Sequence, residues 1–193
     1  YDVFLLDRAT SRIERVSVGP GGAQSSGQAS RFGTVVVSDD GRFVAFDSTG
    51  ADLVPGDTNG VSDVFVRDRQ SGITERVSVA ADGSQAAFPS QRPAMTPDGR
   101  FVAFESDADG LSPVPDDIGT DVYVRDRAEA RTELVSVSSA GEPATGDSTA
   151  PSISADGRYV AFESDADDAV DDDFNDTVDV FVRDRLGRQT ERA

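Results

Sequence analysis

Carboxylate and amide side chains recur at a fixed spacing in two loops of this 193-residue chain. The spacing is Asp-x-Asn-x-x-x-Asp, and its residues are Asp57, Asn59 and Asp63 in one loop and Asp173, Asn175 and Asp179 in the other. Side chains at positions 1, 3 and 7, with a backbone carbonyl near position 5, could wrap one hard cation in oxygen ligands. Because Ca²⁺ takes about six to eight oxygens and tolerates irregular geometry, the loops predict bound calcium.

A third loop, over residues 114–121, is two residues shorter and has no Asn. It offers a weaker set for a metal, with Asp117 and Asp121 as ligands. All three loops also have a simpler interpretation, because Asp and Asn side chains cap backbone N–H groups in turns without any metal. Both interpretations remain open from the sequence.

Composition excludes several kinds of catalytic site. The chain has no His and no Cys, so it has no Ser-His-Asp triad, no imidazole base, no thiolate nucleophile and no zinc–cysteine site. Glu105 and Glu163 could in principle serve glycoside hydrolysis, which uses two carboxyl groups at one site. They occupy the same position of different repeats, and nothing in the sequence brings them together. We therefore expect no enzymatic activity from this chain.

The formal net charge of −18 disfavours nucleic acids and anionic membranes as partners. No apolar run approaches the roughly 20 residues that a transmembrane helix needs, so no membrane insertion is expected. Every basic residue is Arg. Arg-Asp-Arg triplets at 67–69, 125–127 and 183–185 could bind anions, but alternating charges at strand ends are more simply explained by pairs with neighbouring strands.

An internal repeat sets the elements that must position these side chains. The block Ser-Asp-Asp-Gly-Arg-Phe-Val-Ala-Phe at 38–46 recurs, with small changes, at 96–104 and 154–162, a period of 58 residues. A second block, Asp-Val-Phe-Val-Arg-Asp-Arg at 63–69, recurs with the same period at 121–127 and 179–185. A further copy of this second block opens the chain at 2–8.

Each period contains four short predicted strands, which in the third repeat cover 151–154, 158–164, 179–185 and 189–193. Asp156-Gly157 forms a tight hairpin turn between the first two. The second strand is apolar on both faces, which indicates burial between stacked sheets. The pattern predicts an all-β fold, a β-propeller with one four-stranded antiparallel blade per repeat. Its inter-blade core would contain the strand aromatics Phe43, Phe65, Phe101, Tyr123, Tyr159 and Phe181.

The two repeated blocks resemble the TolB-type β-propeller repeat, and the resemblance covers essentially the whole chain. It implies six or more blades, a periplasmic or secreted location, and use as a protein-binding platform or as a module of a larger protein.

The repeat divides the propeller segment 1–193 into a half blade with its connection at 1–28 and three blades at 29–86, 87–147 and 148–193. A six-bladed ring would need about 350 residues at this period. Three and a half blades do not close a ring, so we expect a piece of a larger propeller. Its open blade edges could also self-associate.

Two functions are compatible with these features. The first is a non-catalytic, secreted or periplasmic module that binds a protein or serves as structure, with calcium in its acidic loops. The alternative is the propeller domain of a larger enzyme, such as a peptidase or glycosidase, whose catalytic domain lies outside this chain. A hydrolase elbow of the form Gly-x-Ser-x-Gly in flanking sequence would favour the alternative. The absence of Trp disfavours a carbohydrate-binding propeller.

Overall fold

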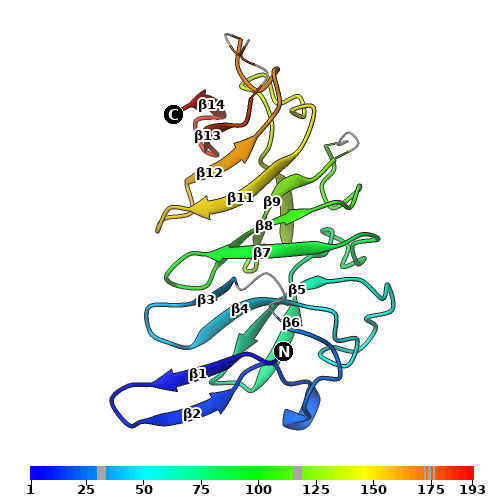
Figure 1. Ribbon diagram of the computed structural model, residues 1–193, viewed down its shortest axis with the longest axis vertical. Coiled ribbons are helices and arrows are strands. Elements are labelled where there is room, and N and C mark those ends of the chain that lie inside the picture. Colours follow the sequence, from blue (N-terminus) through cyan, green and yellow to red (C-terminus); the bar gives the residue numbers. More distant parts are fainter. Residues whose placement is uncertain (30–33, 115–118, 172, 174, 176) are drawn as a thin grey trace.

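The computed structural model describes residues 1–29, 34–114, 119–171, 173, 175 and 177–193. Its sheets follow one another along the long axis of the molecule, from the N-terminal to the C-terminal end (Figure 1). The half blade is the two-stranded sheet β1 (Phe4–Asp7) and β2 (Arg12–Arg15), followed by the short 3-10 helix η1 (Pro20–Gly22).

Three four-stranded antiparallel sheets follow the half blade, each with its strands in sequential order. The first blade contains β3 (Val35–Val37), β4 (Phe43–Ser48), β5 (Asp63–Asp68) and β6 (Ile73–Arg76). The second contains β7 (Ser90–Met95), β8 (Phe101–Ser106), β9 (Asp121–Asp126) and β10 (Arg131–Leu134). The third contains β11 (Ser148–Ile153), β12 (Tyr159–Ser164), β13 (Asp179–Asp184) and β14 (Gln189–Arg192). The predicted all-β class and the four-stranded blade are confirmed.

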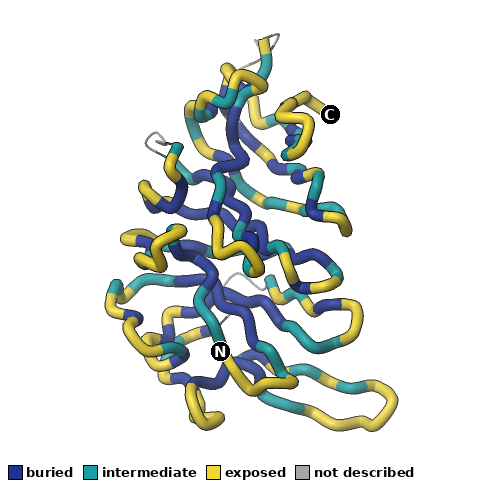
Figure 2. The backbone as a smooth tube through the Cα atoms, turned by 180° about the vertical axis from the view of Figure 1, so that it is seen from behind, coloured by how far each residue is buried: buried dark blue, intermediate teal, exposed yellow. Residues whose placement is uncertain are grey.

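The second and third strands of the first two blades are buried along most of their length, whereas those of the third blade are only partly buried (Figure 2). In β8 the side chains of Val102, Ala103 and Phe104 are all fully buried, although successive side chains of a strand point to opposite faces. In each blade, the pairing of the second and third strands places one aromatic ring of each strand beside the other. The ring centroids are 5.9–6.1 Å apart. The pairs are Phe46–Phe65, Phe104–Tyr123 and Phe162–Phe181.

An arginine after each hairpin glycine ties the start of the second strand to the end of the third. Arg42 donates to both carboxylate oxygens of Asp68, through Nε at 3.0 Å and Nη2 at 2.7 Å. Such two-pronged Arg–carboxylate pairs fix geometry as well as adding energy. The same contacts join Arg100 to Asp126 and Arg158 to Asp184.

Neighbouring blades pack through an aromatic ring placed between two guanidinium groups. The Phe43 ring of the first blade lies 4.6 Å from its own neighbour Arg42 and 4.5 Å from Arg127 of the second blade. It also packs against the hairpin glycine Gly99, where a Cβ would overlap the ring. The second and third blades repeat this arrangement with Phe101, Arg100, Arg185 and Gly157.

The core prediction is wrong for Tyr159, the equivalent residue of the third blade. Tyr159 is 41% exposed and has Arg158 on one side of its ring, because none of the described blades packs against the other side. Phe65, Tyr123 and Phe181 are fully buried, as predicted, while Phe43 and Phe101 are half-buried at the blade interfaces.

We predict that Gly157→Ala lowers the free energy of unfolding by about 1–3 kcal/mol more than Gly141→Ala, because only the first substitution overfills a packed interface. Both glycines have positive φ, of 72° and 87°, so the backbone cost is matched. A Cβ at Gly141 meets nothing within 4 Å, whereas one at Gly157 overlaps Phe101. Urea unfolding of the two variants measures the difference. Equal losses would contradict this packing of the second blade on the third.

A second prediction concerns acid stability. Hydrogen bonds from Arg42 outweigh burial and hold the pKa of Asp68 well below its ordinary value. The unfolded state, with a pKa near 3.9, then binds more protons than the native state below about pH 4, so the contribution of Asp68 is present above that pH and lost below it. We expect Asp68→Asn to be less stable than the wild type at pH 7 and pH 5, with a smaller deficit at pH 3.

Urea unfolding at each pH tests this expectation. Asp39→Asn is the matched control, because Asp39 is exposed on the same hairpin and forms no ion pair among the described residues. A deficit for Asp68→Asn that stayed constant down to pH 3 would show that the carboxylate is not stabilised by Arg42.

Candidate functional site

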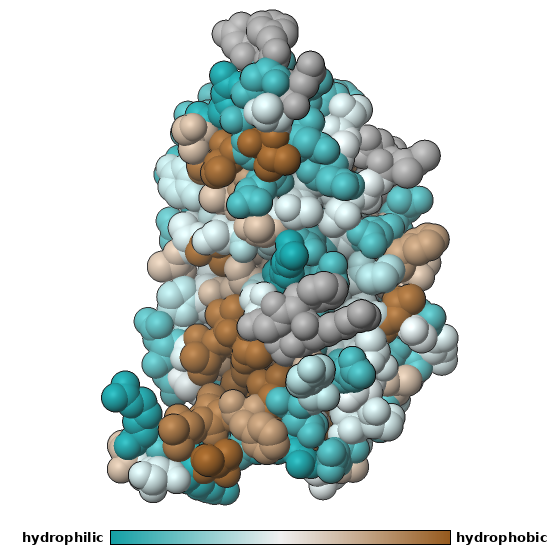
Figure 3. All heavy atoms as spheres, in the orientation of Figure 1, coloured by the Kyte–Doolittle hydropathy of each residue, from teal (hydrophilic) through white to brown (hydrophobic). Residues whose placement is uncertain are grey.

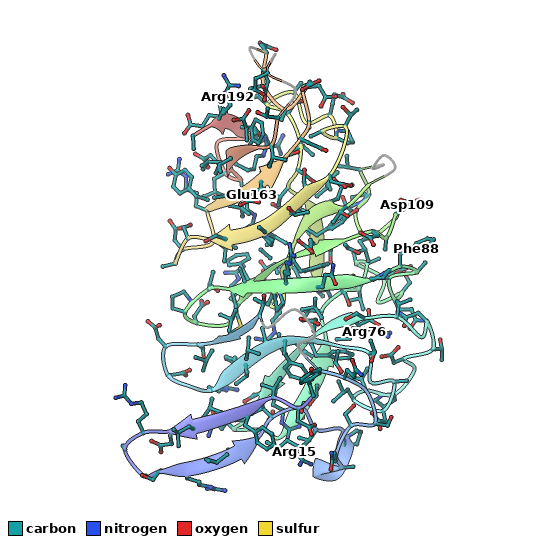
Figure 4. All side chains as sticks on the ribbon, in the orientation of Figure 1. Arg15, Arg76, Phe88, Asp109, Glu163 and Arg192 are labelled. Atoms are coloured by element: carbon teal, nitrogen blue, oxygen red, sulfur yellow. The ribbon has the colours of Figure 1, made fainter. Side chains whose placement is uncertain are left out.

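The acidic loop of the first blade surrounds a guanidinium group. Asp57 and Asp63 are both buried, and both form an ion pair with Arg76 from β6, which is labelled in Figure 4. Its Nη1 is 3.2 Å from Asp57 Oδ1 and 3.5 Å from Asp63 Oδ2. Asn59 donates from Nδ2 to Asp63 Oδ2 at 2.8 Å and to the Ala86 carbonyl at 3.0 Å. The three predicted ligands therefore lie together, around an arginine.

The third blade repeats this arrangement. Arg192 Nη1 from β14 is 2.8 Å from Asp173 Oδ1 and 3.4 Å from Asp179 Oδ2. Asn175 donates from Nδ2 to Asp179 Oδ2 at 2.8 Å, as Asn59 does to Asp63. Asp173 is buried, whereas Asp179 is half-buried and Asn175 is exposed, so this copy is more open to solvent.

The second blade departs from the pattern. Asp117 lies outside the described residues, and Asp121 is buried and accepts a 2.6 Å hydrogen bond from Ser136. The strand position of Arg76 and Arg192 is taken by Leu134. Arginine thus accompanies the full Asp-Asn-Asp set and is replaced by an apolar residue where the set is shortened. A comparison of the fourth strands of the repeats shows that arginine occurs together with the full set, but it does not show that the two are in contact.

Burial makes a positive charge necessary in the first blade. Burial raises the pKa of Asp63, and burial together with the neighbouring Asp63 carboxylate raises the pKa of Asp57. Arg76 opposes both shifts, and its side chain is itself only 9% exposed. A buried carboxylate needs such a partner, because ionisation without one costs several kcal/mol.

The described residues do not fit calcium in this arrangement. The carboxylate oxygens of Asp57 and Asp63 face Arg76, and Asn59 directs its NH₂ group rather than its oxygen toward Asp63. The Asn59 Oδ1 atom instead accepts the Val61 N–H at 3.2 Å. Nowhere in the described part of the chain do three or more Asp, Glu, His or Cys side chains gather closely enough to hold a metal. Calcium binding stays a prediction that would require Arg76 to move away.

Glu105 and Glu163 lie at equivalent strand positions in the second and third blades. Glu105 is buried and accepts hydrogen bonds from the Ala150 N–H at 3.1 Å and from Gln91 at 3.1 Å. Glu163 is exposed at the C-terminal end of the molecule (Figure 4). Their different environments offer no shared site for a pair of catalytic carboxylates.

Comparison with known proteins identifies the fold. No protein-family model matches the chain, and no curated protein matches it. Among solved structures it is similar to TolB from Acinetobacter baumannii, with 17% identity and a TM-score of 0.54 over 99% of this chain and 37% of TolB. The chain therefore has a TolB-like β-propeller fold and spans 37% of the length of that TolB.

Propellers of enzymes share the fold. The chain is similar to a prolyl endopeptidase, with 17% identity and a TM-score of 0.55 over 98% of this chain and 25% of the peptidase. It is also similar to an oligogalacturonate lyase in complex with manganese, with 14% identity and a TM-score of 0.52 over 97% of this chain and 40% of the lyase. In the described residues, no helix is long and apolar enough to cross a membrane.

We predict that Arg76→Leu, which introduces the residue of the second blade, lowers the free energy of unfolding at pH 7 by about 3–5 kcal/mol, because it strips two buried carboxylates of their counter-charge. The matched variant Arg192→Leu should cost less than Arg76→Leu, because Arg192 and Asp179 are partly exposed and only Asp173 is fully buried. Chemical unfolding measures both.

The free energy of unfolding lost in Arg76→Leu should become smaller as the pH falls from 7 to 4. The native pKa values of Asp57 and Asp63 lie above the unfolded value of about 3.9, so the native state takes up more protons than the unfolded state as the pH falls. This uptake removes the charges that lack a partner, and the stability of the variant therefore falls as pH rises. Melting with calcium and then with a chelator adds a second readout. Calcium rather than Arg76 would be shown to neutralise the loop by two results together. The melting temperature of the wild type would rise strongly with calcium, and Arg76→Leu would leave the melting temperature in chelator unchanged.

Proposed function

We propose that this chain is a non-catalytic part of a secreted or periplasmic β-propeller, and that it binds protein through an open blade edge. The observation that carries the proposal is the edge of β1 in the half blade. In each full blade the third strand pairs on both sides, whereas among the described residues β1 pairs with β2 alone. A strand edge of this kind is a template for another strand.

The side chains that β1 exposes include one that is buried at the equivalent position of a full blade. Phe4 is 53% exposed, whereas its equivalent Phe65 is fully buried against a ring of the second strand. Leu6 is also exposed, and so are Val35 and Val37 of β3 in the first blade. Figure 3 shows apolar side chains gathered at this end of the molecule, over the half blade and its neighbour. An added strand would cover this surface.

The register of the full blades specifies that strand. An incoming antiparallel strand would place a Phe opposite Phe4, as Phe46 lies opposite Phe65. An Arg before its first aromatic residue would pair with Asp7, as Arg42 pairs with Asp68. The partner is therefore a segment with the sequence Arg-aromatic-Val-Ala-Phe. The matching strands of a second folded copy (β4, β8 and β12) already pair on both sides, so we favour a strand from a different polypeptide over one from a second copy.

A labelled peptide with the sequence of residues 96–106 tests the proposal by fluorescence anisotropy. We expect it to bind the chain and to lose at least tenfold in affinity when the residue that corresponds to Phe104 is Ala. Asp7→Asn in the protein should weaken binding, whereas Asp39→Asn should not. Equal affinity for both peptides, or no binding, would contradict strand addition at β1. Dimers that the peptide fails to dissociate would indicate self-association through another edge.

The propeller domain of a larger enzyme is the second candidate. It is supported by the similarity to a prolyl endopeptidase and an oligogalacturonate lyase, of which this chain matches only 25% and 40%. In that case the chemistry would belong to a separate domain of the same polypeptide. A Gly-x-Ser-x-Gly elbow encoded beside this segment would favour it, and further propeller repeats alone would favour the non-catalytic module.

A further inference from the structure

We propose that the cleft between the second and third blades binds a small oxyanion, a phosphate or carboxylate group. The cleft has a volume of about 240 Å³ and lies between β10, the loop that follows it and the β13–β14 turn. Four arginines and one glutamate line it, namely Arg131, Arg183, Arg185, Arg188 and Glu133. In a protein with a net charge of −18, this local excess of positive charge is unusual.

Glu133 does not balance the cluster. Arg185 Nε lies 2.6 Å from Glu133 Oε1, and Arg131 Nη2 lies 3.7 Å from the other oxygen of the same carboxylate. Among the described residues, Arg183 and Arg188 form no ion pair with a carboxylate. Two arginines thus share one acid, and two more have none.

Arg183 is held rigidly at the base of the cleft. It is 8% exposed and donates from Nη1 to the Ser138 carbonyl and to Thr190 Oγ1, both at 3.0 Å. Burial lowers its pKa, Glu133 opposes that shift, and the nearby Arg188 lowers the pKa further. Asp184 opposes the shift as well, and an anion in the cleft would add negative charge beside both Arg183 and Arg188.

The cleft between the first and second blades provides an internal comparison. It keeps the scaffold, because Arg125 donates to the Val79 and Ala80 carbonyls and to Thr132, as Arg183 does to its partners. Arg127 likewise pairs with Glu75, as Arg185 pairs with Glu133. The positions of Arg131, Arg188 and Ala140 are taken there by Ile73, Ala130 and Asp82. Packing of the blades therefore does not require the two added arginines.

The ligand class follows from the donors. Guanidinium groups present paired N–H donors that match the oxygens of phosphate and carboxylate. The volume of the cleft suits one such group rather than a polymer. The group could be a free ion or the charged end of a larger ligand. Both would present the same charged group to the arginines, but the larger ligand would bind more tightly than the free ion.

Isothermal titration of the whole chain with inorganic phosphate, acetate and phosphoserine, at constant ionic strength with chloride as control, tests the proposal. We expect phosphate or acetate to bind with one site per chain. The double variant Arg131→Ile, Arg188→Ala carries the residues of the other cleft and should bind at least tenfold more weakly, with unchanged thermal stability in chloride. Tighter binding of phosphoserine than of phosphate would identify a larger ligand, and equal binding a free ion.

The reciprocal variant Ile73→Arg, Ala130→Arg, Asp82→Ala should raise the stoichiometry to two. Wild-type binding that the double variant retains in full would overturn the proposal, since the anion would then be a general counter-ion of surface arginines. Absence of any binding above the chloride control, for both phosphate and acetate, would overturn it as well. The peptide experiment on β1 concerns a different pair of strands and is unaffected by either result.

Discussion

Burial of both faces of the second strand is the constraint on which this structure depends. Val44, Ala45 and Phe46 are all buried, although alternate side chains of a strand point to opposite sides. A single blade can cover one of these faces at most, so each blade needs a neighbour on either side. The stacked sheets, the aromatic rings between guanidinium groups and the exposed surfaces at the two ends all follow from that requirement.

Arginine supplies the positive charge for several carboxylates that this acidic chain buries or half-buries. Arg42 closes a blade on Asp68, Arg127 joins Glu75 across a blade boundary, and Arg76 neutralises two buried aspartates at once. The planar guanidinium group suits these tasks because it donates in several directions and remains ionised when buried. The same property makes Arg188 a candidate for a different role, since it forms no ion pair among the described residues and Ala130 takes its place in the other cleft.

Repetition separates structural from functional features within one chain. Contacts present in every blade, such as the hairpin arginine with its aspartate, are needed to build the blade. Features confined to one interface, such as Arg131 and Arg188, are not. The acidic loops fall between these cases, because two blades keep both the full acidic set and its arginine, and one blade has a shortened set and no arginine. That joint change is what a mutually dependent ion pair produces.

The sequence by itself determined the blade, because a strict 58-residue period, an Asp-Gly turn and a two-faced apolar strand depend on local backbone and burial rules alone. It also identified the acidic residues that lie together. Only the tertiary structure decided what faces them, since Arg76 follows Asp63 by a whole hairpin and reaches it through strand pairing. It likewise left Tyr159 exposed and gathered four arginines between two blades, because both results depend on which blades adjoin.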